Sequence, residues 1–347
     1  MQEAGSEQGS GSSIPNNQIW YTSTNGAVVK PYATDVFGAN IVSNTYENGQ
    51  GVIKFDAPVT LIGEAAFCYC ETLKSITIPD SVTEIGKEAF TVCTSLTMFY
   101  GKFASKDGRC LIVDGVLNSF AIGCGVTEYV IPDSVTSIGY CAFYGCTSLK
   151  SVTIPDGVIE IGEGAFVGLI SLTSVTIPKS VTKIGWQAFQ DCTSITRVNI
   201  SDLSAWCKID FAMNIPIGDR LGDSNPLSIA IDGNTQLFLN GEEVVDLIIP
   251  YDVTQINVDT FMGCSSINTV VLHSGVKVVN TGAFSWCANL SRVYCWAIHP
   301  PIGGGDMFFK TDSDLTIYVP TASVNEYKIS AYWDIYKNCI VGYDFPL

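Results

Sequence analysis

Apolar residues recur along this chain with a spacing of 23 positions. An aliphatic residue stands five positions before each marker phenylalanine, and a valine stands eight positions before it. Self-similarity at such a period is typical of stacked units that cannot bury their apolar faces alone. The pattern therefore predicts a repeat solenoid. The marker phenylalanines are Phe67, Phe90, Phe143, Phe166, Phe189, Phe261 and Phe284.

The other half of each unit alternates apolar and polar residues, as a half-buried strand does. In one unit Val152 and Ile154 fall on one face, Ser151 and Thr153 on the other, and Pro155 ends the pairing because it has no N–H. At about 4.8 Å per rung, the chain predicts one parallel sheet of about eleven rungs, roughly 50 Å long. Its rungs are marked by Phe55, Ile78, Gly101, Ile131, Ile154, Ile177, Ile200, Ile249, Leu272, Cys295 and Val319.

A column of small residues stands four positions before each phenylalanine. It holds glycine in five units and asparagine in the last two, and both residue types tolerate a positive φ. We therefore expect a left-handed turn in all seven units. The positions are Gly63, Gly86, Gly139, Gly162, Gly185, Asn257 and Asn280.

Two long steps interrupt the period, near residues 103–127 and 201–243. The first contains Asp114-Gly115 between apolar runs and predicts a hairpin. The second carries Trp206 and an Asn240-Gly241 turn. Insertions in solenoids form loops on one face, which is often the functional face.

The ends of the chain differ from the repeats, as the caps of a stacked array must. Residues 1–13 are predicted to be a flexible polar tether, residues 14–50 an N-terminal cap, residues 51–320 the solenoid, and residues 321–347 a C-terminal cap.

Each cap has a predicted internal structure. The segment Gln18–Tyr32 is predicted to form a β-hairpin around Asn25-Gly26. In the C-terminal cap, Thr321 can N-cap a short helix that runs to about Trp333, and a last strand follows from Ile340 to Tyr343.

Composition and charge narrow the function classes. Apolar residues make up 47% of the chain and charged residues 15%, which is enough apolar material for an extensive core. The formal net charge of −16 would repel polyphosphates and anionic lipid surfaces. We therefore expect no nucleic-acid partner. We also expect no membrane-spanning helix, because no apolar run reaches the necessary length.

The repeating unit Leu-x-x-Val-x-Ile-Pro-x-Ser-Val-x-x-Ile-Gly-x-x-Ala-Phe-x-x-Cys resembles the BspA-like, or Treponema-type, leucine-rich repeat over residues 50–320. The tail from Ile317 to Val324, with residues 340–345, is similar to the C-terminal caps of such proteins. The units of Phe261 and Phe284 depart from the pattern, with asparagine for glycine and His273 for proline.

The resemblance implies a leucine-rich-repeat stack in a surface-exposed or secreted protein of a commensal bacterium or a parasite. It also implies adhesion to host matrix proteins or other cells. Many relatives are lipid-anchored, so an N-terminal lipid anchor on the tether is the expected membrane contact.

Most of the thirteen cysteines are explained by the period. They stand three positions after the phenylalanines, where Leu169 is the exception, and a column that exchanges with leucine is a core column. We expect free buried thiols rather than disulfides, which would distort the stack. No Cys-x-x-Cys pair is present, so no metal site and no cofactor are expected. The column holds Cys70, Cys93, Cys146, Cys192, Cys264 and Cys287.

The residue pattern gives little support to a catalytic site. His273 stands at a position where other units carry proline, so we expect it to be a turn residue. His299 lies in a connection, and the glycines at 303–305 lack the Lys-Ser/Thr of a phosphate loop. Carboxylates are scattered through turns, and nothing selects a facing pair. We expect no enzyme and assign no catalytic residue.

The outward face of the predicted sheet carries the candidate site. Several of its early rungs carry only serine and threonine, and a solvated ladder explains those rungs. The later rungs bear arginine and aromatic residues, the types enriched in binding hot spots. The candidate binding residues are Arg197, Asn199, Arg292, Tyr294, Trp296 and Tyr318.

The residues and the resemblance are compatible with four functions. The favoured one is a protein-binding adhesion module that uses the concave sheet face and the 201–243 insertion. A carbohydrate-binding surface protein is the main alternative, because sugars also stack on aromatic faces. A spacer that presents another domain and a hydrolase with an unrecognised site are the others. If Arg292, Tyr294 and Tyr318 are covered by the insertion or a cap, they belong to the core instead.

Overall fold

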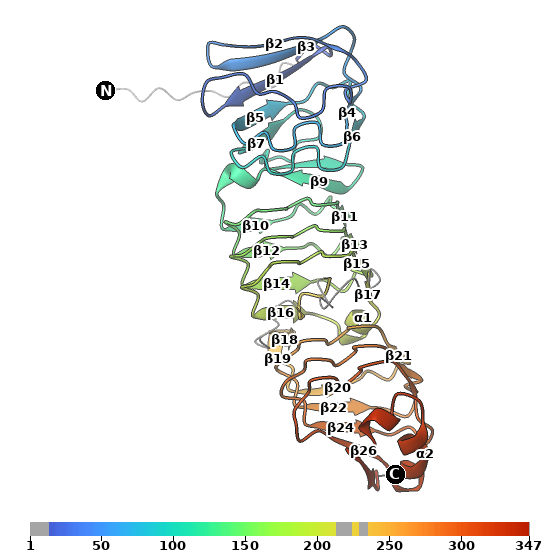
Figure 1. Ribbon diagram of the computed structural model, residues 1–347. Coiled ribbons are helices and arrows are strands. Elements are labelled where there is room, and N and C mark those ends of the chain that lie inside the picture. Colours follow the sequence, from blue (N-terminus) through green and yellow to red (C-terminus); the bar gives the residue numbers. More distant parts are fainter. Residues whose placement is uncertain (1–13, 213–223, 229–234, 347) are drawn as a thin grey trace, which may run out of the picture. The chain divides into compact units, whose positions relative to one another are not determined.

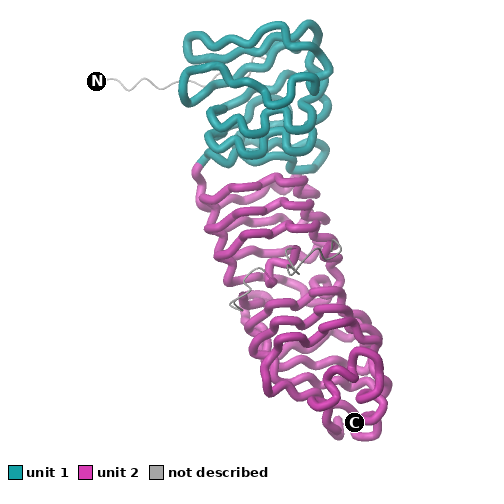
Figure 2. The backbone as a smooth tube through the Cα atoms, in the orientation of Figure 1, with its two compact units in different colours: residues 1–124 teal, residues 125–347 magenta. Residues whose placement is uncertain are grey.

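The computed structural model describes residues 14–212, 224–228 and 235–346. These residues form two compact units, Met1–Cys124 and Gly125–Leu347, which are called unit 1 and unit 2 below (Figure 2). The predicted tether, residues 1–13, lies outside the described residues.

Unit 1 is built on a five-stranded sheet in the order β2-β3-β1-β5-β7. β1 pairs antiparallel with both β3 and β5, whereas β5 and β7 are parallel. The antiparallel strands form the N-terminal cap, and the parallel pair begins the repeats. The strands are β1 (Gln18–Ser23), β2 (Ile41–Glu47), β3 (Gln50–Phe55), β5 (Leu73–Thr77) and β7 (Met98–Tyr100).

The predicted cap hairpin is present, but at a different place. β2 and β3 form it around Asn48 and Gly49, both with positive φ, as a tight hairpin turn requires. The expected hairpin around Asn25-Gly26 is wrong, because β1 finds its partners in distant strands rather than in the next segment. Phe55 is likewise not a parallel rung, since β3 runs antiparallel between β2 and β1.

The rest of unit 1 contains a short parallel pair and a hairpin. β4 (Leu61–Ile62) pairs with β6 (Glu84–Ile85). β8 (Cys110–Val113) and β9 (Val116–Phe120) form the hairpin predicted at Asp114-Gly115, which is therefore confirmed. A single 3-10 turn, Ile122–Cys124, follows.

Unit 2 stacks its main strands in two parallel ladders of five (Figure 1). Between them β19 (Glu242–Glu243) turns back antiparallel to β18 at Asn240-Gly241, so the expected single sheet is interrupted. The first ladder holds β10 (Glu128–Val130), β12 (Ser151–Thr153), β14 (Ser174–Ile177), β16 (Arg197–Ile200) and β18 (Gln236–Leu239). The second holds β20 (Asp246–Ile248), β22 (Thr269–Leu272), β24 (Arg292–Cys295), β26 (Thr316–Pro320) and β27 (Ile340–Tyr343).

Short two-residue strands line the other side of unit 2. Residues 23 apart face each other there, for example Ile138 and Ile161. One ladder holds β11 (Ser137–Ile138), β13 (Glu160–Ile161), β15 (Lys183–Ile184) and β17 (Asp210–Phe211). The other holds β21 (Gln255–Ile256), β23 (Val278–Val279) and β25 (Ile302–Gly303).

The segment 201–243 is more regular than the sequence predicts. β17 stacks on β15 and β18 stacks on β16, so the described part of this segment largely completes a further solenoid turn. A short helix, α1 (Leu203–Cys207), buries Trp206, whose indole N–H donates to the Thr260 carbonyl at 3.0 Å. Trp206 is therefore a core residue. Residues 213–223 and 229–234 lie outside the described residues.

The marker phenylalanines form stacked columns inside each unit. In unit 1 the rings of Phe67 and Phe90 stack at 5.5 Å. In unit 2 the rings of Phe143 and Phe166 stand 5.2 Å apart, and those of Phe166 and Phe189 5.1 Å apart. A second stack joins Phe261, Phe284 and Phe308, and Phe308 extends the period beyond the sequence pattern.

The predicted left-handed turn at the Gly/Asn column is wrong, because none of its seven residues has a positive φ. The column is instead a place of close approach. A Cβ on Gly86 would lie 2.5 Å from the amide nitrogen of Glu64 in the preceding unit. Asn280 occupies the same position in a later unit, and its Nδ2 donates a hydrogen bond to the Ile256 carbonyl of the preceding unit at 2.9 Å.

Around each marker phenylalanine and Phe308, left-handed residues lie two positions before and two positions after the aromatic residue. They bracket the tight turn that presents the aromatic ring to the core. The first set is Ala65, Glu88, Cys141, Gly164, Gln187, Asp259, Gly282 and Asp306, with φ between 50° and 66°.

The C-terminal cap contains α2 (Val324–Ile329) between two 3-10 turns, Thr321–Ser323 and Asp334–Tyr336, and ends with the predicted strand β27. Thr321 is not the N-cap, because its hydroxyl donates to the Asp344 carboxylate at 2.7 Å instead. Among the described residues, no helix has the length and apolarity needed to cross a membrane.

Candidate binding surface on the main sheet of unit 2

Strand pairing in the second ladder brings five apolar residues into one line on the outer face of the sheet. Each is paired in register with the next, from β20 through β27. This line is called the apolar column. It consists of Ile248, Val271, Tyr294, Tyr318 and Val341.

Aromatic rings gather at the C-terminal part of the apolar column. Tyr294 and Tyr318 stack at 4.6 Å with an interplanar angle of 11°, and Tyr343 meets both edge-on at 5.6 Å. Phe345 contacts Tyr343 at 4.9 Å and Trp296 at 5.3 Å. These five residues are called the aromatic platform.

The aromatic platform is partly accessible. Tyr294, Trp296 and Tyr318 are half-buried, Arg292 is exposed, and Tyr343 is 40% exposed. The C-terminal cap therefore lies against the candidate residues without enclosing them, unlike the core rings Phe261 and Phe284, which are fully buried.

Four of the six candidate residues thus come together, and two do not. Arg197 and Asn199 lie on β16 in the first ladder. There Arg197 Nε donates to Asn199 Oδ1 at 2.7 Å, and the guanidinium covers the Phe238 ring at 3.5 Å. Both side chains are engaged locally, so the single predicted stripe is two separate clusters.

Sequence reasoning missed Tyr343 and Phe345. The alternation of Val341, Tyr343 and Phe345 carried the signal. Their position beside Tyr294 and Trp296 depended on the parallel pairing of β27 with β26.

With this geometry in place, comparison with known sequences identifies the repeat. The pattern described as BspA type Leucine rich repeat region matches in six copies, over residues 39–103, 117–209 and 234–335. The chain belongs to the BspA-type leucine-rich repeat proteins. No curated protein matches the chain in sequence.

Solved structures of similar proteins come from several bacteria. A leucine rich cell surface protein of Faecalibacterium prausnitzii is 22% identical, with 68% of this chain and 57% of that chain covered and a TM-score of 0.41. A leucine-rich repeat protein of Eubacterium ventriosum is 22% identical, with 75% and 64% covered and a TM-score of 0.45. The pneumococcal vaccine antigen PcpA is 15% identical, with 82% and 58% covered and a TM-score of 0.42. The chain spans less than two thirds of the length of each of these proteins.

The cysteine column of this BspA-type chain is buried, as expected, and it also forms hydrogen bonds. The thiols of Cys93, Cys192 and Cys287 donate to the carbonyl of the phenylalanine one unit earlier, at 3.0–3.1 Å. Burial raises the pKa of Cys192 to about 12 and that of Cys93 further. Thiols in this state are poor nucleophiles and poor metal ligands.

The histidines have structural roles. His273 is buried, its Nδ1 accepts from the Gly275 N–H at 3.0 Å, and its Nε2 lies 3.0 Å from the carbonyls of Pro250 and Val253. This histidine therefore ties together two successive turns. His299 pairs with Glu326 at 3.0 Å on the surface. In the described part of the chain, no cluster of three or more His, Cys, Asp or Glu could hold a metal.

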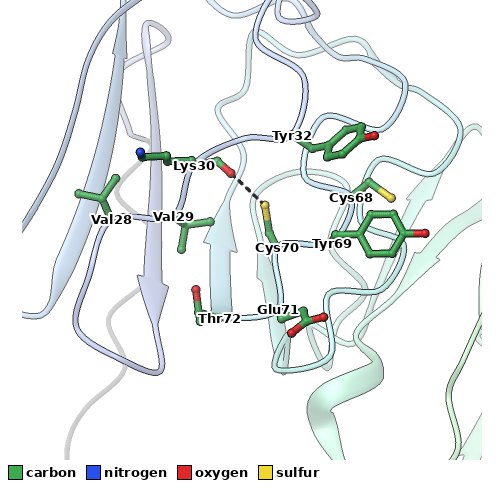
Figure 3. Close-up of a pocket in the computed structure, with 9 residues that line it drawn as sticks. All are labelled: Val28, Val29, Lys30, Tyr32, Cys68, Tyr69, Cys70, Glu71 and Thr72. Carbon is green, nitrogen blue, oxygen red and sulfur yellow. Dashed lines mark hydrogen bonds between the residues drawn. The ribbon is translucent and has the colours of Figure 1, made fainter.

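A depression of about 380 Å³ lies in unit 1 (Figure 3). The exposed rings of Tyr32 and Tyr69 stand 6.1 Å apart on one side of it, and the Cys70 thiol donates to the Lys30 carbonyl at 3.3 Å. Burial raises the pKa of Cys70 to about 11, so this thiol is not an activated nucleophile.

A second depression, of about 390 Å³, lies beside α1 in unit 2. Ser204 and Lys208 both donate to one oxygen of Asp252, Lys208 at 2.7 Å. The hydrogen bond to Asp252 raises the pKa of Lys208, so the ammonium stays protonated and cannot serve as a base for Ser204. These contacts with Asp252 hold α1 against the neighbouring turn.

Proposed function

We propose that this BspA-type protein is a non-enzymatic, extracytoplasmic adhesion protein that holds a host or matrix protein on the outer sheet face of unit 2. The observation that carries the proposal is the half-exposed aromatic platform. Tyrosine and tryptophan offer large contact area at low entropic cost and dominate binding hot spots.

Two further points support the location and the class. The similar protein of Faecalibacterium prausnitzii is described as a cell surface protein. The apolar column is also longer than the scattered single apolar residues that a protein surface normally shows. A lipid anchor upstream of residue 14 belongs to the same proposal.

The test is binding of immobilised extracellular-matrix proteins to the full chain and to the double variant Tyr294→Ala/Tyr318→Ala. We expect the variant to lose at least about tenfold in affinity, as hot-spot truncations do. Tyr144→Ala is the matched control, because Tyr144 is 38% exposed and lies outside the main strands. Equal loss in both variants, or in neither, would reject the platform as the binding surface.

Carbohydrate binding is the alternative, favoured by the stacked Tyr294–Tyr318 pair. A glycan array separates the two. Glycan binding that depends on Tyr294, together with no binding to matrix proteins, would replace the adhesion proposal.

A further inference from the structure

We propose that the aromatic platform receives an extended, cationic segment of the partner protein. This inference rests on the proposed binding function of the same surface and specifies the chemistry of its ligand. Three observations carry it: carboxylates without ion-pair partners around the platform, platform rings without a covering cation, and the elongated form of the apolar column.

Exposed carboxylates border the platform and the column. Asp246 lies in the strand position that aligns with Thr269, Arg292 and Thr316. Asp314 stands two residues before the first residue of β26. In the sequence, Asp344 lies between the platform residues Tyr343 and Phe345. None of these three carboxylates forms an ion pair with another described residue.

Asp312, four residues before β26, adds a fourth carboxylate without an ion-pair partner among the described residues; one of its oxygens accepts the Asp314 N–H at 2.8 Å. Arg292 lies on the same face of β24, and it too is without an ion-pair partner among the described residues. Acids therefore outnumber Arg292 among the charged residues named here. Unit 2 as a whole has the same sign, with 22 acidic and 11 basic residues.

Three rings elsewhere in the chain are each approached by a cation of the same chain. Arg197 covers Phe238 at 3.5 Å, Lys310 covers Trp286 at 3.9 Å, and Lys102 lies 4.8 Å from the Phe103 ring centre. No described cation covers a platform ring. A cation over the face of tyrosine or tryptophan is attracted by the ring quadrupole. A lysine or arginine from a partner would complete the arrangement that the chain makes for itself elsewhere.

The form of the surface selects an extended ligand. From Ile248 to Val341 the apolar column crosses four rung spacings, which is roughly 19 Å. A single side chain covers a fraction of that length, whereas about six residues of extended chain span it. Aromatic rows of this kind are used to dock extended proline-containing segments.

The experiment measures fluorescence anisotropy of three labelled peptides of equal length, with repeating Lys-Pro, Glu-Pro or Ser-Pro, on the full chain. We expect the Lys-Pro peptide alone to bind, and more weakly at about 0.5 M than at about 0.05 M salt. Asp246→Asn and Asp314→Asn should each weaken it about threefold. Asp156→Asn, which changes an exposed aspartate in the turn after β12, should leave it unchanged.

Binding of Ser-Pro or Glu-Pro peptide as strong as that of Lys-Pro would overturn the inference. So would Lys-Pro binding that Asp156→Asn weakens as much as Asp314→Asn, because that would indicate general attraction to an acidic protein. Absence of peptide binding beside Tyr294-dependent binding of matrix proteins would also reject the cationic ligand but keep the proposed function. Matrix binding that ignores Tyr294 and Tyr318 would reject the proposed function itself.

Discussion

The thiol of Cys93 donates a hydrogen bond to the carbonyl oxygen of Phe67, 3.0 Å away and 26 residues earlier in the chain. The same relationship joins Cys192 to Phe166 and Cys287 to Phe261. Each links one turn of the stack to the turn before it. The column thus combines apolar packing with a weak polar contact that leucine at position 169 cannot make.

The thiol column predicts low cysteine reactivity. Burial raises the pKa of these thiols, so they stay protonated at neutral pH and react slowly with disulfide reagents. Ten of the thirteen cysteines are buried, and Cys124, Cys141 and Cys339 are partly accessible. We expect at most these three to react rapidly in the native protein. All thirteen should react in denaturant without reductant, and a lower count there would reveal disulfides.

The phenylalanine stack predicts a large loss of stability on truncation. Phe166 is fully buried between the rings of Phe143 and Phe189. Phe166→Ala should lower the free energy of unfolding by roughly 3–5 kcal/mol, because it leaves a cavity inside the stack. Chemical denaturation measures the loss. Tyr144→Ala, on the exposed side of the preceding turn, should stay within about 1 kcal/mol of the parent.

The two backbone roles found around each phenylalanine predict opposite substitution effects. Gly185→Ala places a Cβ 2.7 Å from the carbonyl carbon of Gly162 and should destabilise by roughly 1–3 kcal/mol. Gln187 has φ of 55°, so Gln187→Gly removes left-handed strain of about 1 kcal/mol and should be neutral or stabilising. Thermal unfolding of the two variants compares them. A stabilising Gly185→Ala would contradict the close approach.

Asp259 predicts a defined pH dependence. Burial raises the pKa of its carboxyl to about 6 from an ordinary 3.8. The folded state therefore binds this proton more tightly than the unfolded chain does. The stabilisation that results from the raised pKa of Asp259 is complete below about pH 4. It is lost as the pH rises through about 6. The loss amounts to roughly 3 kcal/mol at most.

Asp259→Asn tests this dependence, because asparagine keeps the shape, tolerates the φ of 54° and cannot ionise. We expect the variant to unfold at a higher temperature than the parent at about pH 8 and at a similar temperature at about pH 4. Asp306→Asn is the control, since Asp306 occupies the same left-handed column but is exposed. An equal gain in the control would assign the effect to net charge instead.

The sequence by itself determined the period, the phenylalanine and cysteine core columns, the alternating strands and the hairpin at Asp114-Gly115. These features follow from local chemistry repeated many times. A residue that must be buried in every unit leaves the same mark in every unit, and Asp-Gly encodes its turn within two residues.

Only the tertiary structure decided the rest, because it depended on contacts between turns. Gly86 looked like a left-handed residue, but it is small because the preceding turn lies against it. Gln18–Ser23 pairs with strands far away in sequence rather than with its neighbour. The candidate site shows the same division. Composition pointed to Tyr294 and Tyr318, whereas the platform with Tyr343 exists because parallel pairing of β27 brings a residue from the end of the chain beside them.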